Sequence, residues 1–106
     1  MTSKLQSQVI RNKYPDTIPI IIKKHSVPMK KYKYIVPSEV SVSTFLLKLR
    51  EYLLEKISSH DALFLFTENG TLINGNVMMH VIDKQHRNEN DGFLYLTFQK
   101  ENVFGN

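Results

Sequence analysis

Residues 41–57 read SVSTFLLKLREYLLEKI, and this stretch does most to decide the fold class of the chain. Ser41 can cap a helix, because its hydroxyl can accept a hydrogen bond from a backbone N–H of the first turn. After it, apolar residues recur at steps of three or four, which is typical of a helix with one apolar face. These residues are Val42, Phe45, Leu46, Leu49, Leu53 and Ile57. The spacing therefore predicts one long helix that lies across the rest of the fold.

Shorter apolar runs before and after this helix have the composition of β-strands. Residues 18–22 are β-branched apart from Pro19, which restricts the run to a strand start or a sheet edge. Residues 31–36 alternate, which places Tyr32, Tyr34 and Val36 on one face and Lys31, Lys33 and Ile35 on the other. These two runs predict a hairpin. Residues 63–66 and 93–98 predict two further strands.

Two shorter helices complete the predicted order of elements. Leu5, Val9 and Ile10 have helical spacing ahead of Pro15, which disfavours helix for the residue before it. Later in the chain, one face of a second short helix is predicted from Val77, Met78, Val81 and Ile82. The order helix, strand, strand, long helix, strand, short helix, strand predicts an α+β fold with helices on one face of a sheet, as in the β-grasp arrangement.

The composition suits one compact domain. A chain of 106 residues that is 42% hydrophobic can bury a single core. We expect an N-terminal helix at residues 1–13, one β-grasp domain at residues 14–100 and a flexible tail at residues 101–106. The lack of cysteine excludes disulfides and thiol nucleophiles and suits the cytosol. Residues 1–8 do not resemble a signal peptide, and no segment has the roughly 20 apolar residues that span a bilayer. Any membrane role must therefore be acquired.

The positive charge of the chain gathers in its first half. The formal net charge is +4, and five lysines fall within eleven positions: Lys23, Lys24, Lys30, Lys31 and Lys33. Residues 29–34 interleave cations with aromatic rings, a combination that can bind nucleic acids. The predicted alternation separates the tyrosines from the lysines, however, so one surface cannot present both sets. We expect a solvated lysine face over a packed tyrosine face and no nucleic-acid partner.

The sequence nominates no catalytic or metal-binding residue. The four histidines, His25, His60, His80 and His86, are scattered without the spacing of a metal site. Three carboxylates that could act as acid or base, Asp83, Glu89 and Asp91, are expected to be solvated. The pairs at residues 69–70 and 74–75 are turn sequences and not phosphate-binding loops. We therefore expect no enzyme activity, no cofactor and no metal.

A series of motifs spread over most of the chain carries a family resemblance. In chain order they are Arg11 with residues 13–16 (KYPD), residues 18–21 (IPII), residues 33–37 (KYIVP), Val42 with Phe45, residues 49–50 (LR), residues 62–64 (ALF), residues 91–95 (DGFLY) and residues 101–105 (ENVFG). In this order and spacing, the chain resembles the autophagy ubiquitin-like modifiers, the family of the GABA-receptor-associated protein and the microtubule-associated light-chain proteins.

The resemblance implies a ubiquitin-like tag. A cysteine protease would remove Asn106, activating and conjugating enzymes would carry the chain, and Gly105 would be joined to phosphatidylethanolamine. A glycine suits these steps because an enzyme cleft can surround its backbone closely. The tag would be cytoplasmic at first and then lipid-anchored on autophagosomal membranes. The alternative is a peptide-binding adaptor of the same fold that is not conjugated.

The resemblance also implies a groove for extended peptides of cargo receptors and adaptors, which add a strand to the sheet edge. It assigns an aromatic pocket to Ile10, Pro19, Ile21, Lys33, Ile35 and Phe93. It assigns an aliphatic pocket to Tyr34, Val36, Pro37, Val40, Phe45 and Leu49, and Arg50 joins the peptide-binding set. The nearby lysines would attract acidic residues that flank the peptide.

Several positions depart from the family pattern. The chain has room for one helix before Tyr14, where the family usually has two. Gln6 stands where an acidic residue is often found beside the aromatic pocket. Glu51 and Tyr52 stand where basic residues are common, so we expect a shifted peptide preference. Residues 72–74 replace a usual double proline, and the segment between the first two strands is about four residues short of the family's usual length.

Overall fold

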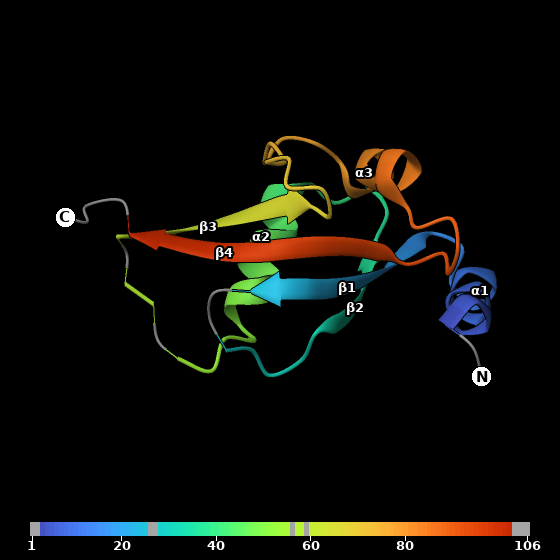
Figure 1. The fold of residues 1–106 in the computed structure, drawn as a ribbon, viewed down its shortest axis with the longest axis horizontal. Coiled ribbons are helices and arrows are strands. Elements are labelled where there is room, and N and C mark those ends of the chain that lie inside the picture. The colour runs from blue at the N-terminus through green and yellow to red at the C-terminus, as the bar shows by residue number, and fades with distance from the viewer. Residues whose placement is uncertain (1–2, 26–27, 56, 59, 103–106) are drawn as a thin grey trace.

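The structure is a computed structural model that describes residues 3–25, 28–55, 57–58 and 60–102 (Figure 1). Its elements in chain order are α1 (Ser3–Lys13), β1 (Thr17–His25), β2 (Lys33–Pro37), α2 (Val42–Arg50), β3 (Asp61–Thr67), α3 (Met79–His86) and β4 (Leu94–Asn102). The predicted order of helices and strands is confirmed. Gly105 and Asn106, the predicted processing site, lie outside the described residues.

The four strands form one mixed sheet in the order β2-β1-β4-β3. β1 and β2 pair as the predicted antiparallel hairpin, and β3 pairs antiparallel with β4. The first and last strands run parallel to each other in the centre, where Ile20 lies opposite Leu94. This arrangement confirms the predicted β-grasp sheet and leaves β2 and β3 as its two edges.

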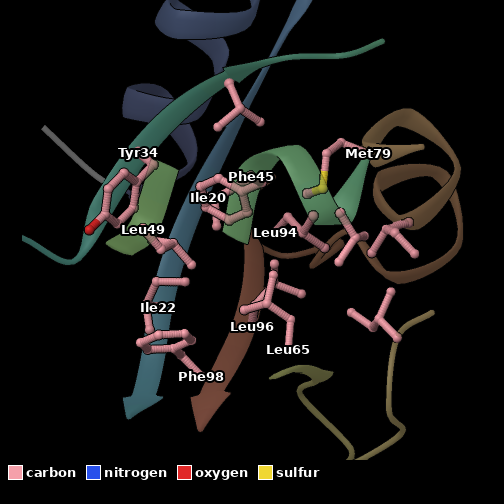
Figure 2. Packing of buried hydrophobic residues seen from close by; sticks show 14 of the residues in the cluster. Ile20, Ile22, Tyr34, Phe45, Leu49, Leu65, Met79, Leu94, Leu96 and Phe98 are labelled. Atoms are coloured by element: carbon pink, nitrogen blue, oxygen red, sulfur yellow. The ribbon is translucent and has the colours of Figure 1, made fainter. Parts of the chain in front are cut away.

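The core lies between one face of the sheet and the helices α2 and α3. Phe45 and Leu49 of α2 and Met79 of α3 are buried against strand residues such as Ile20 and Leu96 (Figure 2). In β2 the burial alternates, so that Tyr34 and Val36 face this core while Lys33, Ile35 and Pro37 are exposed. The predicted alternation is thus confirmed within the strand. Tyr32 precedes β2 and is exposed, so the prediction that it packs is wrong.

The long helix is shorter than its apolar spacing predicted. Ser41 does cap it, since its hydroxyl accepts a hydrogen bond from the backbone N–H of Thr44, but the helix ends at Arg50. The next N–H groups donate to carbonyls three residues back, and the chain then pairs with residues 28–30. Lys30 N–H donates to the Tyr52 carbonyl (2.7 Å), and a bridge joins Met29 to Leu53. Leu53 is therefore buried by this pairing and not as a helical residue.

The buried face of α3 also begins one residue later than predicted. Met78 forms a bridge with Ser41 just before the helix and remains 42% exposed. Met79 is the first helical residue, and its N–H donates to the Val40 carbonyl at 2.8 Å. The side chains of Met79 and Ile82 therefore enter the core, because pairing before the helix sets its starting residue.

The sequence predicted helices on one face of the sheet. Helix α1 departs from this prediction, because it does not lie on the face that α2 and α3 cover. It lies at the end of the sheet where β1 and β4 begin (Figure 1). Its apolar residues Leu5 and Val9 are each 50% exposed, whereas Ser7 is buried. The helix is therefore attached to the domain mainly through polar contacts.

Candidate functional site

The edge strand β2 directs every second backbone unit away from the sheet. Ile22 N–H donates to the Tyr32 carbonyl and Ser38 N–H to the Asp16 carbonyl, each at 2.8 Å. These pairs fix the phase of the hairpin, in which hydrogen-bonded and non-hydrogen-bonded pairs alternate. Tyr34 and Val36 are thus bonded to β1. The N–H and C=O groups of Lys33 and Ile35 point toward the open edge.

The position of Pro19 is consistent with this alternation of hydrogen-bonded and non-hydrogen-bonded pairs. It lies opposite Ile35, in a pair that exchanges no backbone hydrogen bonds, so β2 does not need its missing N–H. On its other side, the pairing of β1 with β4 begins only at Ile20. Pro19 therefore lies on a stretch of β1 that has one neighbouring strand, which is why a proline is accepted in a central strand.

A cleft of about 520 Å³ opens between α1 and β2. Its lining comprises Gln6, Val9, Ile10, Lys31, Lys33, Tyr34, Ile35 and Phe93. Of the predicted aromatic pocket, the structure brings together Ile10, Lys33, Ile35 and Phe93. Pro19 is buried and Ile21 is half-buried, and neither lines the cleft. Val9 and Lys31 were missed, although Val9 belongs to the apolar spacing that predicted the helix.

A second cleft of about 260 Å³ lies between β2 and α2. Its lining comprises Ile35, Val36, Pro37, Val40, Thr44, Phe45 and Lys48. Four residues of the predicted aliphatic pocket are therefore brought together, namely Val36, Pro37, Val40 and Phe45. Leu49 is fully buried in the core, Tyr34 lines the first cleft instead, and Arg50 lines neither cleft. Thr44 and Lys48 were missed, because apolar spacing marks only the buried stripe of the helix.

Ile35 lines both clefts. It is 49% exposed, so an apolar side chain in the edge strand is accessible to a partner. The outward backbone of Ile35 and its side chain therefore stand at the centre of the site.

A lysine is held over two aromatic rings at the rim of the first cleft. Lys31 Nζ lies 4.9 Å from the ring centre of Tyr34 and 4.6 Å from that of Tyr52. The Tyr34 hydroxyl donates to the Lys31 carbonyl at 2.9 Å. Burial and the neighbouring phenols raise the pKa of Tyr34 to about 12, so its hydroxyl keeps the proton that it donates.

Polar contacts fix α1, which forms one wall of the first cleft. Arg11 donates to both oxygens of Asp83 (3.0 and 2.8 Å) and to the Gly92 carbonyl (2.7 Å). The Ser7 hydroxyl donates to the Asp91 carbonyl. Gly92 has a φ of +79°, and a side chain there would also collide with Ser7. The wall of the cleft thus depends on residues outside it.

The prediction that Asp83 is solvated is wrong. Its side chain is 6% exposed and also accepts a hydrogen bond from Arg87 at 2.6 Å. Burial alone would raise its pKa, but the hydrogen bonds and charges of Arg11 and Arg87 lower the pKa of Asp83 below its ordinary value. Asp91 is also bonded, since it accepts from the Phe93 N–H at 3.0 Å and from the Tyr95 hydroxyl.

Two further observations concern the described part of the chain. Within residues 3–25, 28–55, 57–58 and 60–102, no three His, Asp or Glu side chains are grouped so that they could hold a metal ion. None of the helices in this part is both long and apolar enough to cross a membrane.

Comparison with known proteins decides the family. The family model described as "Autophagy protein Atg8 ubiquitin like" matches residues 2–105. The chain belongs to the Atg8 family. Autophagy-related protein 8e of Arabidopsis thaliana is 39% identical over 106 residues, which cover 96% of this chain and 84% of the relative. Autophagy-related protein 8 of Schizosaccharomyces pombe is 40% identical, with the same coverage of each chain.

A solved structure agrees with this assignment. The crystal structure of Trypanosoma brucei ATG8 superposes with a TM-score of 0.84 at 30% identity, covering 97% of this chain and 89% of that one. The resemblance drawn from the sequence motifs is thus confirmed. As an Atg8-family member, the chain has a role in autophagy as a ubiquitin-like protein.

Proposed function

We propose that this Atg8-family chain is a ubiquitin-like modifier that is cleaved after Gly105, joined there to phosphatidylethanolamine, and binds extended peptides of cargo receptors and adaptors along β2. The observation that carries the proposal is an open strand edge with a cleft on each side of Ile35. Such an edge supplies both of the elements that strand addition needs, namely backbone groups for affinity and side-chain pockets for specificity.

In this proposal the peptide pairs with the outward N–H and C=O groups of Lys33 and Ile35. An aromatic side chain occupies the larger cleft, beside Phe93 and Ile10, and a second side chain occupies the smaller cleft beside Phe45. Lys31 and Lys33 at the rim of the larger cleft attract acidic residues next to the aromatic one.

Conjugation at Gly105 is supported by the extent of the family match, which runs to residue 105. A processing protease, an activating enzyme and a conjugating enzyme would carry out the covalent steps, so the chain acts as their substrate and not as an enzyme. The lipid then transfers a cytoplasmic protein to the autophagosomal membrane.

Reconstitution tests the conjugation. The chain is incubated with the processing, activating and conjugating enzymes of an Atg8 system, ATP and phosphatidylethanolamine vesicles, and its mass is measured. We expect a product that ends at Gly105 and is heavier by one lipid. Asn106→Ala should give the same product, because Asn106 is removed, whereas Gly105→Ala should give none. Lipidation of Gly105→Ala to the level of the parent would contradict the proposed attachment site. Absence of any lipidated parent would favour the non-conjugated adaptor.

Substitution of Ile35 tests the groove. We expect Ile35→Asp to weaken binding of an aromatic-containing extended peptide by about tenfold or more, because it places a charge at the centre of the site. Leu47→Asp is the matched control, since Leu47 is 66% exposed on α2 and lines neither cleft. Fluorescence anisotropy gives the affinities. Equal affinities for Ile35→Asp and the parent would refute peptide docking at β2.

A further inference from the structure

The smaller cleft combines apolar walls with two polar groups from one helix. Val36, Val40 and Phe45 supply the apolar part, while Thr44 and Lys48 come from α2. These two residues are four positions apart, so they lie on neighbouring turns of the same helix face. An ammonium group and a hydroxyl therefore border the cleft together on one side.

The ammonium group of Lys48 has no strong partner among the described residues. Its Nζ lies 3.9 Å from a carboxylate oxygen of Glu51, and the two side chains are 58% and 66% exposed. An ion pair this long and this exposed contributes little. The Thr44 hydroxyl accepts from the Ser41 hydroxyl at 3.2 Å, which leaves its own proton for another acceptor. Both groups can thus serve a ligand in the cleft.

The carboxylates closest to this region do not share the cleft. Asp16 and Glu39 line a separate hollow, which has only Pro37 in common with the smaller cleft. Glu51 follows the last residue of α2 and is not part of the lining, although its carboxylate lies 3.9 Å from Lys48 Nζ. Among the described residues that line the smaller cleft, Lys48 is therefore the one that carries a charge.

We infer that the smaller cleft selects a glutamate of the bound peptide over a leucine. This inference rests on the proposed docking of peptides at β2. The two methylene groups of a glutamate would pack against Val36 and Phe45, and its carboxylate would reach Lys48 and Thr44. A leucine would fill the apolar part equally, but it would offer no acceptor to the ammonium group of Lys48 or to the hydroxyl of Thr44.

A peptide panel measures this selection. Each extended peptide carries one tryptophan for the larger cleft and a leucine, glutamine or glutamate placed two, three or four residues after it. At the spacing that binds best, we expect the glutamate peptide to bind the parent protein about threefold more tightly than the leucine peptide, which is the range of an exposed ion pair. Glutamine should fall between them, and added salt should reduce the preference.

Substitutions of Lys48 then test whether this lysine causes the preference for glutamate. Lys48→Leu should reverse it in favour of leucine, and Lys48→Gln should abolish it. The matched control Lys84→Leu removes the same charge from an exposed position on α3 and should leave the preference unchanged.

The outcomes separate this inference from the proposed function. If peptides bind and Ile35→Asp weakens them, but the parent prefers leucine or Lys48→Leu leaves the order unchanged, the selection for glutamate is overturned and docking at β2 stands. If Ile35→Asp binds the whole panel as well as the parent does, docking at β2 fails and the inference fails with it.

Discussion

Asp83 shows how one buried carboxylate can hold together segments that are far apart in sequence. It receives hydrogen bonds from Arg11 of α1 and from Arg87 just after α3, and Arg11 also bonds the Gly92 carbonyl. Because α1 buries little apolar surface, these charge-assisted bonds carry much of its attachment. The position of Ile10 in the larger cleft depends on them.

We expect Asp83→Asn to destabilise the fold by about 2 kcal/mol, since the change weakens hydrogen bonds to two charged groups that stay in place. Peptide affinity should fall as well, because α1 would be held less firmly against the domain. Chemical denaturation and anisotropy measure the two effects. Asp16→Asn is the control, as Asp16 is exposed. A variant with full stability and full affinity would show that the bonds do not position α1.

The pH dependence of stability should also report on Asp83. Its pKa is lower in the folded chain than the ordinary value of 3.8, so its contribution is complete above that value. The contribution is lost as the pH falls below 3.8 and through the folded pKa. We expect the free energy of unfolding of the parent to decline more steeply in this window than that of Asp83→Asn. Parallel curves would contradict the assigned pKa direction.

Lys33 offers a test of charge at the larger cleft. We expect Lys33→Glu to weaken peptides with acidic flanks by about fivefold at low salt and less at physiological salt, since the interaction is exposed and screened. Peptides with neutral flanks should bind the variant and the parent alike. Anisotropy at two salt concentrations decides the point, and an unchanged affinity for acidic peptides would exclude this role.

The sequence predicted the roles of some residues of the site and not of others. Ile35 and Phe93 could be assigned to the larger cleft because a family motif surrounds each of them. The pairing of Asp83 with Arg11 could not be predicted, because Arg11 lies 72 positions away. The local signal was Arg87, four positions after Asp83, and it was not used. Lys48 was missed because a lysine beside an apolar stripe is usually a solvated residue.

At the scale of elements, β2 has two sets of backbone groups with different tasks. Tyr34 and Val36 bond to β1 and hold the hairpin, while Lys33 and Ile35 face outward. The outward N–H of Ile35 can therefore be removed without loss of the hydrogen bonds that hold β2 in the sheet.

Proline substitution separates the two sets. We expect Ile35→Pro to keep the fold and lose peptide binding, because the missing N–H points outward, while Val36→Pro should unfold the hairpin. Ile35→Ala removes the side chain but keeps the N–H, so weaker binding by Ile35→Pro than by Ile35→Ala would isolate the backbone contribution. Two-dimensional NMR spectra report the fold. Equal affinities of these two variants would mean that the peptide does not bond to this edge.

The types and order of the elements followed from periodicity, whereas some boundaries did not. The apolar spacing of α2 continues to Ile57, yet the helix ends at Arg50 because residues 52–54 pair with residues 28–30. A partner segment that lies so far back in the chain leaves no local signal. The start of α3 was displaced for the same reason, by the bridge between Ser41 and Met78.

At the scale of the molecule, the larger cleft and the end of β4 lie apart. β4 ends at the opposite end of the sheet from α1, in a molecule whose longest dimension is 45 Å (Figure 1). The larger cleft is bounded by α1, and the proposed lipid attachment follows β4 in sequence. If the proposed function holds, we expect the membrane anchor and the bound peptide to engage different regions of the surface.

We expect the lipid-conjugated chain on vesicles to bind a peptide within about twofold of the affinity of the free chain, since the peptide site is already formed before conjugation. Flotation of vesicles with a labelled peptide gives the comparison, and vesicles without the conjugate control for direct peptide adsorption. An affinity loss of tenfold or more would mean that the membrane covers the groove.

Because Ile35 lines both clefts, peptide binding in one cleft is not independent of peptide binding in the other. A bulky peptide side chain in one cleft that displaces the side chain of Ile35 reduces the volume of the other cleft. Contributions of paired peptide substitutions should therefore fail to add. During evolution, a substitution that enlarges one cleft would therefore restrict which peptide side chains the other cleft can accept.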